Sequence, residues 1–364
     1  MSSAKNEIWT VVGAGHAGYS IIGRLGTWGY RLRVLDIDAP KVAALAASGG
    51  LHVEGGDRDF APVELATTDP AKAIRGAGVI VVCTYGTEHA RVAETIAPFL
   101  EDGQTILLLQ GNMAGALIVR RALQKAGCRA QVDVADMDSS PFQAKALAVD
   151  RVLLTGMKAK WQVAAMPATR TAAVLERVGS AFRGMVAAPS LLHTGFADLG
   201  GVFHVGGIIT NVSRVEDAGV YHFYSSNMVP SVCNLLLKLD AERVAIAKAC
   251  GVEASDAVSW LASTYKMAPT SLHDMLHALA ETAYKYSPAP KSLTHRFLVQ
   301  DVGCVLVPIA GLGRAAGIPS PTIDAAIEIA GALTGRDFWR EGRSPDALGI
   351  AGMTIPQIIE HIRR

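Results

Sequence analysis

Three glycines, Gly13, Gly15 and Gly18, follow an apolar run at residues 8–12 and precede a helical pattern that begins near residue 19. This GxGxxG spacing suits the turn between a strand and a helix, because glycine permits a tight turn, close approach of a ligand and close helix packing. Unpaired N–H groups at the start of the helix would then face an anion. The sequence therefore predicts that a dinucleotide pyrophosphate is bound by Gly13, Ala14, Gly15, His16, Ala17 and Gly18.

A carboxylate, Asp36, ends the next apolar run, residues 31–35, at the distance from the glycines that a dinucleotide fold requires. Asp36 is expected to accept hydrogen bonds from the adenosine ribose hydroxyls. The residues that follow, 37–39, contain no arginine that would neutralise a 2′-phosphate. The pattern therefore predicts NAD (NADH) as the cofactor in preference to NADP.

Composition bounds the class of protein. The chain has 364 residues, half of them hydrophobic, which suits two domains. Its five cysteines lie far apart without metal-ligand spacing, so neither a disulfide framework nor a metal site is predicted. A formal net charge of +1 without a basic block argues against nucleic-acid binding, and the sequence shows no signal-peptide pattern and no long apolar run. We expect a cytoplasmic protein that acts on small molecules, without membrane or nucleic-acid partners.

Strand and helix patterns alternate over the first part of the chain. Strands are predicted at residues 8–12, 31–35, 78–83 and 105–109, and helices at 19–28, 40–47, 88–99 and 115–125. Such alternation is typical of a doubly wound parallel sheet, in which ligands bind at the carboxyl edge. The residues that follow two of these strands are therefore candidates for ligand contact: Thr84, Tyr85, Gln110 and Asn112.

The pattern changes in the second half of the chain. Residues 132–190 are more strand-like, with strands at 151–155, 162–167 and 185–188 and a helix at 171–182, and they extend the first domain. Beyond residue 191, helical segments are predicted around 221–250, 254–265, 271–280, 295–316 and 321–334. We therefore predict an α/β fold with a Rossmann-type domain at residues 1–190, followed by an all-helical domain at residues 191–364 that would bind the substrate.

Two segments of the second domain carry groups suited to proton transfer and carboxylate binding. His204 lies in an apolar, glycine-flanked stretch, and Arg296, Gln300 and Asp301 lie in one predicted helix, where positions four apart share a face. Arg296 would hold a carboxylate, His204 would exchange a proton, and Asp301 would fix the imidazole tautomer. On the pattern alone a purely structural interpretation is favoured, because single histidines and Arg–Asp pairs on helices are commonly structural.

Further motifs are spread over nearly the whole chain. Besides the glycine turn they are Asp102-Gly103-Gln104-Thr105 with Gln110-Gly111-Asn112, Ser139-Ser140-Pro141-Phe142, Phe203-His204, Leu239-Asp240-Ala241-Glu242-Arg243, His295-Arg296-Phe297-Leu298 with Asp301, and Gly342-Arg343-Ser344 through Leu348-Gly349. Together they resemble the opine dehydrogenase family, of the octopine and nopaline dehydrogenase type. The resemblance implies a helical domain akin to that of 6-phosphogluconate dehydrogenase, a homodimer, and NAD(P)H-dependent reductive condensation of an amine, typically an amino acid, with a 2-oxo acid in the interdomain cleft.

The resemblance also implies roles for particular residues. His204 and Asp301 match the catalytic pair of the family, and Arg296 lies in the segment that faces the substrate. Gln300 stands where the family usually has glutamate, which removes a negative charge beside the pair. The stretch before His204 also lacks the Asn-Pro often found there, so a smaller or less polar amine is conceivable.

Two other functions stay open from the sequence. A 2-hydroxy-acid dehydrogenase of the 6-phosphogluconate-related type would oxidise NADH with a 2-oxo acid alone, whereas an opine dehydrogenase requires an added amine. A sensor would bind NAD(H) without turnover. Arg296, Asn112 and Gln300 are the candidates for substrate binding, while Thr270 and Ser271 would line the cleft or serve as cap or loop residues.

Overall fold

The structure is a computed structural model that describes residues 5–217, 221–285 and 289–364. The chain divides into two compact units. Unit 1 comprises Met1–Thr194 and Glu360–Arg364, and unit 2 comprises Gly195–Ile359.

The larger sheet of unit 1 is wound in both directions from β1. Its strand order is β12 (Met185–Ala187), β11 (Trp161–Met166), β8 (Asp133–Met137), β7 (Thr105–Leu108), β6 (Ala77–Val82), β1 (Ile8–Val12), β2 (Arg31–Leu35) and β5 (Leu65–Thr67). All neighbouring strands are parallel except β8 and β11. The predicted doubly wound sheet is thus confirmed, with one antiparallel pair, because a β-hairpin instead of a helix links β8 to β11.

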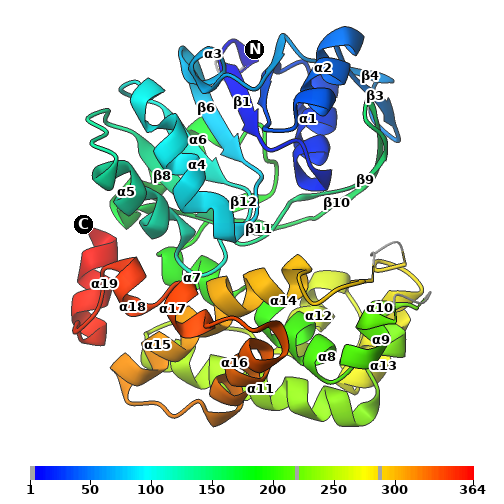
Figure 1. The fold of residues 1–364 in the computed structure, drawn as a ribbon, viewed down its shortest axis with the longest axis vertical. Helices are drawn as coiled ribbons and strands as arrows, with labels where there is room; N and C mark the ends of the chain where they lie inside the picture. The colour runs from blue at the N-terminus through cyan, green and yellow to red at the C-terminus, as the bar shows by residue number, and fades with distance from the viewer. Residues whose placement is uncertain (1–4, 218–220, 286–288) are drawn as a thin grey trace. The chain divides into compact units, whose positions relative to one another are not determined.

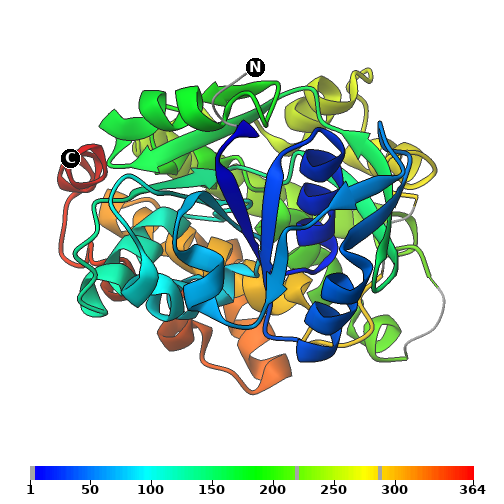
Figure 2. The same cartoon turned by 90° about the horizontal axis from the view of Figure 1, so that it is seen from above.

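A second, four-stranded sheet accompanies the first. Its order is β4 (Phe60–Pro62), β3 (Gly50–Glu54), β10 (Arg151–Met157) and β9 (Phe142–Ala148). Helix α1 (His16–Thr27) packs against strands of both sheets (Figure 1, Figure 2). Its Gly26 allows this, because an added Cβ would lie 2.6 Å from the Cβ of Ala61. Of these strands only β10 was predicted, since β9 is rich in alanine, which has low strand propensity.

The other helices of unit 1 connect the strands. They are α2 (Ala39–Ser48), α3 (Pro70–Ile74), α4 (His89–Ile96), α5 (Gly115–Lys125) and α6 (Thr171–Val178). Trp9 on β1 is fully buried and contacts the rings of Tyr30 and Phe182, with centroids 5.3 and 6.0 Å apart. This packing fixes the strand that leads into the glycine turn.

Unit 2 is helical, and its described residues contain no strand. Its helices are α8 (Gly206–Ile209), α9 (Val212–Glu216), α10 (Phe223–Ser226), α11 (Pro230–Ala249), α12 (Ala257–Tyr265), α13 (Leu272–Ala280), α14 (Arg296–Asp301), α15 (Val307–Ala316), α16 (Pro321–Thr334), α17 (Phe338–Glu341) and α18 (Pro345–Leu348). Helices α7 (Leu191–Phe196) and α19 (Ile355–Arg363) each include residues of both units. The helical segment predicted at 221–250 is split into α10 and α11, because Pro230 begins a new helix.

The central helix of unit 2 runs from Arg296 to Ala316 through α14, a π-helical stretch η6 (Val302–Leu306) and α15. It has the length and hydropathy of a membrane span, but 89 % of its most apolar 18-residue window is buried in the protein, as in a core helix. A second π-helical stretch, η5 (Gly201–Val205), packs against α14 and η6. Single π-turns are rare in proteins, and those that occur often lie at functional sites. The two π-helical stretches here contact each other.

Candidate active site

The glycine turn of unit 1 has the shape that a diphosphate needs. Gly13 has φ +94°, a conformation that L side chains rarely adopt, and its N–H donates to Leu35 O at 2.8 Å. A Cβ at Gly18 would lie 1.9 Å from Gly13 O, so helix α1 reaches the strand only with glycine there. A Cβ at Gly15 would meet nothing within 4 Å. The backbone at Gly15 is therefore open to a ligand, and the turn fits a dinucleotide pyrophosphate.

Asp36 closes this turn. Its Oδ2 accepts from Ala14 N at 2.5 Å and its Oδ1 from Asp38 N at 2.9 Å. Lys41 Nζ lies 3.8 Å from Asp36 Oδ2 and 3.6 Å from Asp38 Oδ2. Lys41 was not predicted at this site, because it stands in the first turn of α2, beyond residues 37–39. Two carboxylates against one ammonium leave this corner with a net negative charge.

The other candidates in unit 1 lie at strand ends. Thr84 follows β6 and lies beside the glycine turn: its Cγ2 is 3.0 Å from where a Cβ on Gly13 would be. Tyr85 is 58 % exposed. Gln110 and Asn112 follow β7, and Asn112 is buried with φ +54°, a strained conformation that asparagine tolerates better than most residues. His16 is exposed, and its Nδ1 accepts from Ala146 N at 3.3 Å.

Unit 2 brings His204 and Asp301 together. His204 Nδ1 lies 2.6 Å from Asp301 Oδ2, although the two residues are far apart in the chain. The Asp301 side chain is 2 % exposed and that of His204 14 %. The ring of His204 stacks on Phe297, with centroids 3.7 Å apart and an angle of 5° between the planes. Since a carboxylate only accepts, Nδ1 carries the proton and Nε2 is the atom that can gain or lose one.

Glycines bring the helix of His204 this close to its neighbours. A Cβ on Gly200 would lie 2.8 Å from Asp301 Oδ2, and a Cβ on Gly206 would lie 2.3 Å from Leu236 Cδ2 on α11. Larger residues at these positions would therefore push the helix away from Asp301 on one side or from α11 on the other. The glycine-flanked histidine of the sequence is explained by close packing.

The neighbouring predicted residues lie on α14. Gln300 is buried, and its Nε2 donates to Asp301 Oδ1 at 3.3 Å. Arg296 is half-buried, with its guanidinium carbon 4.8 Å from the centre of the Phe297 ring, and it pairs with no carboxylate of the described residues. Ser271 is the N-cap of α13, where its Oγ accepts from Asp274 N, and Thr270 precedes it in a loop. The remaining substrate candidate, Asn112, belongs to unit 1.

One residue next to His204 was missed. Tyr224 Oη lies 2.8 Å from His204 Nε2, and its ring stacks on Tyr284 with centroids 4.2 Å apart. Burial raises the pKa of Tyr224, so its phenol stays protonated. Only the packing of α10 places it there: a Cβ on Gly207 would lie 2.9 Å from Phe223 Cζ. No spacing in the sequence connects Tyr224 with His204.

His295, which opens the motif on α14, has a different place. Its Nδ1 accepts from Phe297 N, as the N-cap of the helix. Burial lowers the pKa of His295 to about 4, and the nearby charge of Arg296 acts in the same direction. His295 is therefore neutral at pH 7 and serves as a cap.

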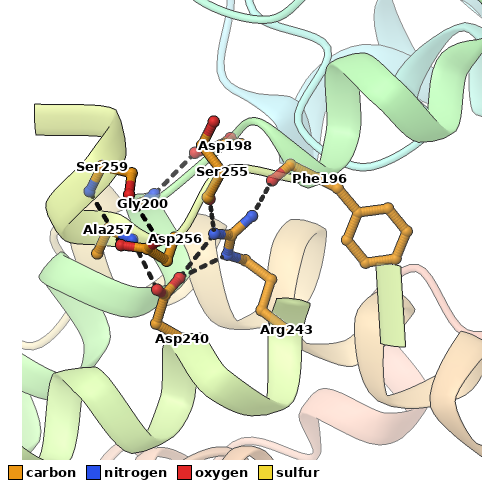
Figure 3. Close-up of polar contacts among 9 residues, drawn as sticks. All are labelled: Phe196, Asp198, Gly200, Asp240, Arg243, Ser255, Asp256, Ala257 and Ser259. Atoms are coloured by element: carbon orange, nitrogen blue, oxygen red, sulfur yellow. Dashed lines mark hydrogen bonds and ion pairs between the residues drawn. The ribbon is translucent and has the colours of Figure 1, made fainter. Parts of the chain in front are cut away.

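The Leu239–Arg243 motif is a buried junction (Figure 3). Arg243 Nε and Nη2 donate to Asp240 Oδ1 at 2.9 and 2.7 Å, and both side chains are at most 3 % exposed. Arg243 also donates to the carbonyls of Phe196 and Ser255, while Asp240 Oδ2 accepts from Ala257 N. This junction ties α11 to the chain just before η5 and just before α12, and so helps to place His204.

Comparison with known proteins finds relatives for both parts of the chain. The family described as "NAD/NADP octopine/nopaline dehydrogenase, alpha-helical domain" matches residues 187–334, and "Ketopantoate reductase PanE/ApbA" matches residues 9–140. An opine dehydrogenase of Arthrobacter sp. (strain 1C) is 30 % identical over 97 % of this chain and 98 % of its own.

Two solved structures share the fold. Octopine dehydrogenase in complex with NADH and agmatine has a TM-score of 0.77 at 19 % identity, covering 97 % of this chain and 98 % of its own. NADP⁺-bound yersinopine dehydrogenase has a TM-score of 0.73 at 16 % identity, covering 98 % of both chains. The full-length match to the Arthrobacter enzyme is the finding that shows the family. The chain belongs to the opine dehydrogenases, NAD(P)-dependent oxidoreductases that act on CH–NH bonds.

Proposed function

We propose that this opine dehydrogenase condenses an amine, typically an amino acid, with a 2-oxo acid, and that His204 and Asp301 carry its proton chemistry. The observation that carries the proposal is the 2.6 Å contact between His204 Nδ1 and Asp301 Oδ2, whose side chains are largely buried. Asp301 holds the imidazole in the tautomer that leaves Nε2 as base, and it stabilises the imidazolium. In the synthetic direction the imidazolium is the acid that helps the carbinolamine lose water.

Arg296 is the proposed anchor of the substrate carboxylate. Its guanidinium lies beside the ring that stacks on His204, and no described carboxylate pairs with it. A bidentate, charge-assisted contact there would place the α-carbon of the 2-oxo acid near the imidazole. Gln300 and Asn112 are the further proposed substrate contacts. Gln300 adds no negative charge beside His204 and Asp301. This favours an amine substrate that does not need a carboxylate at position 300 as its partner.

The glycine turn is the proposed cofactor site. Residues Gly13 to Gly18 would hold the pyrophosphate, Asp36 the adenosine ribose, and Thr84 and Tyr85 the adjacent part of the dinucleotide. The nicotinamide, when bound, supplies the hydride that reduces the C=N bond. The net negative charge at Asp36, Asp38 and Lys41 supports NADH over NADPH, because a 2′-phosphate would be repelled.

The test is NADH consumption with a panel of 2-oxo acids, each with and without amino acids and simple amines. We expect oxidation only when both substrates are present. Oxidation with a 2-oxo acid alone would favour a 2-hydroxy-acid dehydrogenase, and NADH binding without any turnover would favour a sensor. His204→Ala should bind NADH normally and lose turnover; near-native turnover would contradict the assignment.

The family resemblance alone supports a proposal for the oligomeric state. We propose a homodimer in the cytoplasm. Light scattering coupled to size-exclusion chromatography would report the mass in solution, and a monomer across the working concentration range would contradict the dimer.

A further inference from the structure

Both polar atoms of the His204 ring are already engaged within unit 2. Nδ1 contacts Asp301, and Nε2 contacts Tyr224 Oη at 2.8 Å. One face of the ring is covered by Phe297, and Phe223 lies 6.0 Å away at an angle of 59°. The hydrogen-bonding position at Nε2, from which a substrate atom would take a proton, is therefore already occupied by the Tyr224 hydroxyl.

Tyr224 is held rigidly at this position. It is 6 % exposed, and its ring stacks on Tyr284, whose hydroxyl accepts from Tyr265 Oη at 2.9 Å. The positive charge of Arg296 also acts on the Tyr224 hydroxyl and lowers the pKa of Tyr224, although burial raises that pKa by more. A carboxylate held by Arg296 would thus lie in the neighbourhood of the phenol.

The donors and acceptors change in a defined way when His204 gains a proton. In the neutral imidazole Nε2 accepts, so the Tyr224 hydroxyl donates to it. In the imidazolium Nε2 becomes a donor and the phenol oxygen accepts. The phenolic hydrogen is then released to point toward another acceptor.

We propose that Tyr224 is a catalytic residue that passes the proton between His204 Nε2 and the substrate oxygen. The inference rests on the proposed function, in which His204 is the acid. The phenolic proton moves to the carbinolamine hydroxyl, and the Nε2 proton moves to the phenol oxygen. The C–O bond breaks with its electron pair on the departing water, and the nitrogen lone pair forms the C=N bond. Tyrosine ends as it began, and the positive charge passes from the imidazolium to the iminium.

Tyr224→Phe removes the relaying oxygen and keeps the ring stack. The matched control is Tyr284→Phe, which removes a hydroxyl from the same stack that bonds to Tyr265 and not to His204. We expect Tyr224→Phe to lower kcat by about 100-fold or more, as loss of acid–base catalysis does. NADH affinity and Tm should match those of the control, which keeps its activity. A kcat within threefold of native for Tyr224→Phe would overturn the relay.

A proton inventory separates relaying from mere positioning. Two protons move together in the relay, so kcat of the native enzyme should depend on the deuterium fraction of the solvent along a curve, and that of Tyr224→Phe along a straight line. A straight line, or no solvent isotope effect, in the native enzyme would overturn the relay. His204→Gln keeps the two proposals apart: if it is inactive while Tyr224→Phe is active, only the relay fails, and if it is active, the proposed function fails.

Discussion

Replacing Asp301 by asparagine tests how the imidazole tautomer is set. In the native protein Oδ2 faces His204 Nδ1 and Oδ1 faces the amide nitrogen of Gln300, so both carboxylate oxygens accept. Asparagine has only one acceptor oxygen. While Gln300 keeps its donor toward residue 301, the asparagine oxygen faces Gln300 and its NH₂ group faces Nδ1. Nδ1 must then accept, and the proton of the neutral imidazole moves to Nε2.

The size of the effect follows from what is lost. With its proton on Nε2, His204 cannot take a proton from an opine in the oxidative direction. Removal of a positioned general base lowers rates by about 10²- to 10⁴-fold. This corresponds to about 2.7 to 5.4 kcal/mol of transition-state stabilisation at 1.36 kcal/mol per tenfold. The burial of Asp301, with a side chain 2 % exposed, leaves little room for a water to replace the lost acceptor.

The assay is NADH formation from NAD⁺ and the opine that the substrate panel identifies, with NADH binding measured by fluorescence. Asp301→Asn should bind NADH normally and lose kcat by the factor above. The double variant Asp301→Asn with Gln300→Glu is the control, because glutamate only accepts and would turn the asparagine oxygen back toward Nδ1. We expect it to recover part of the rate. A single variant within tenfold of native would refute the reasoning.

Two further predictions concern the junction and the glycine turn. Arg243→Met leaves the Asp240 carboxylate buried with one remaining N–H donor, that of Ala257. We therefore expect the free energy of unfolding, measured by urea titration, to fall by about 3–5 kcal/mol. A loss below about 1 kcal/mol would contradict a tightly coupled pair. Gly15→Ala should keep the native Tm yet bind NADH at least tenfold more weakly, since its Cβ enters open space that the diphosphate needs. Gly18→Ala should instead lower both the Tm and the NADH affinity, because its Cβ would lie 1.9 Å from the main-chain oxygen of Gly13. Equal NADH affinity for the native protein and Gly15→Ala would refute this placement of the diphosphate.

The large sheet of unit 1 could be predicted because its signals are local. Buried strands such as β1 and β6 are short runs of apolar residues, and glycine and aspartate positions mark the turns. The small sheet could not be predicted in this way. Strand β9 carries alanine and lysine, and it is held by pairing with β10 and by packing on α1. Contacts between distant segments decide its conformation, and a window of sequence does not contain them.

The helical site was predictable only in part, for a related reason. Spacing along one helix put Arg296, Gln300 and Asp301 together, their chemistry suggested a link to His204, and the family resemblance strengthened that link. Lys41 was within reach of the sequence, since it lies in the first turn of the helix after Asp36. Tyr224 was not, because its place depends on how closely Phe223 approaches a glycine of another helix.

The two π-helical stretches add a physical limit to such predictions. His204 lies within η5, and Asp301 immediately precedes η6. In a π-helix the hydrogen bonds join residues five apart, so the positions that face one neighbour no longer recur at intervals of three and four. Helical periodicity is therefore least informative at the turns that carry the proposed acid and its carboxylate. The reaction proposed for this chain depends on those turns, because they place His204 and Asp301, while the approach of Phe223 to Gly207 on α8 brings Tyr224 to His204 Nε2.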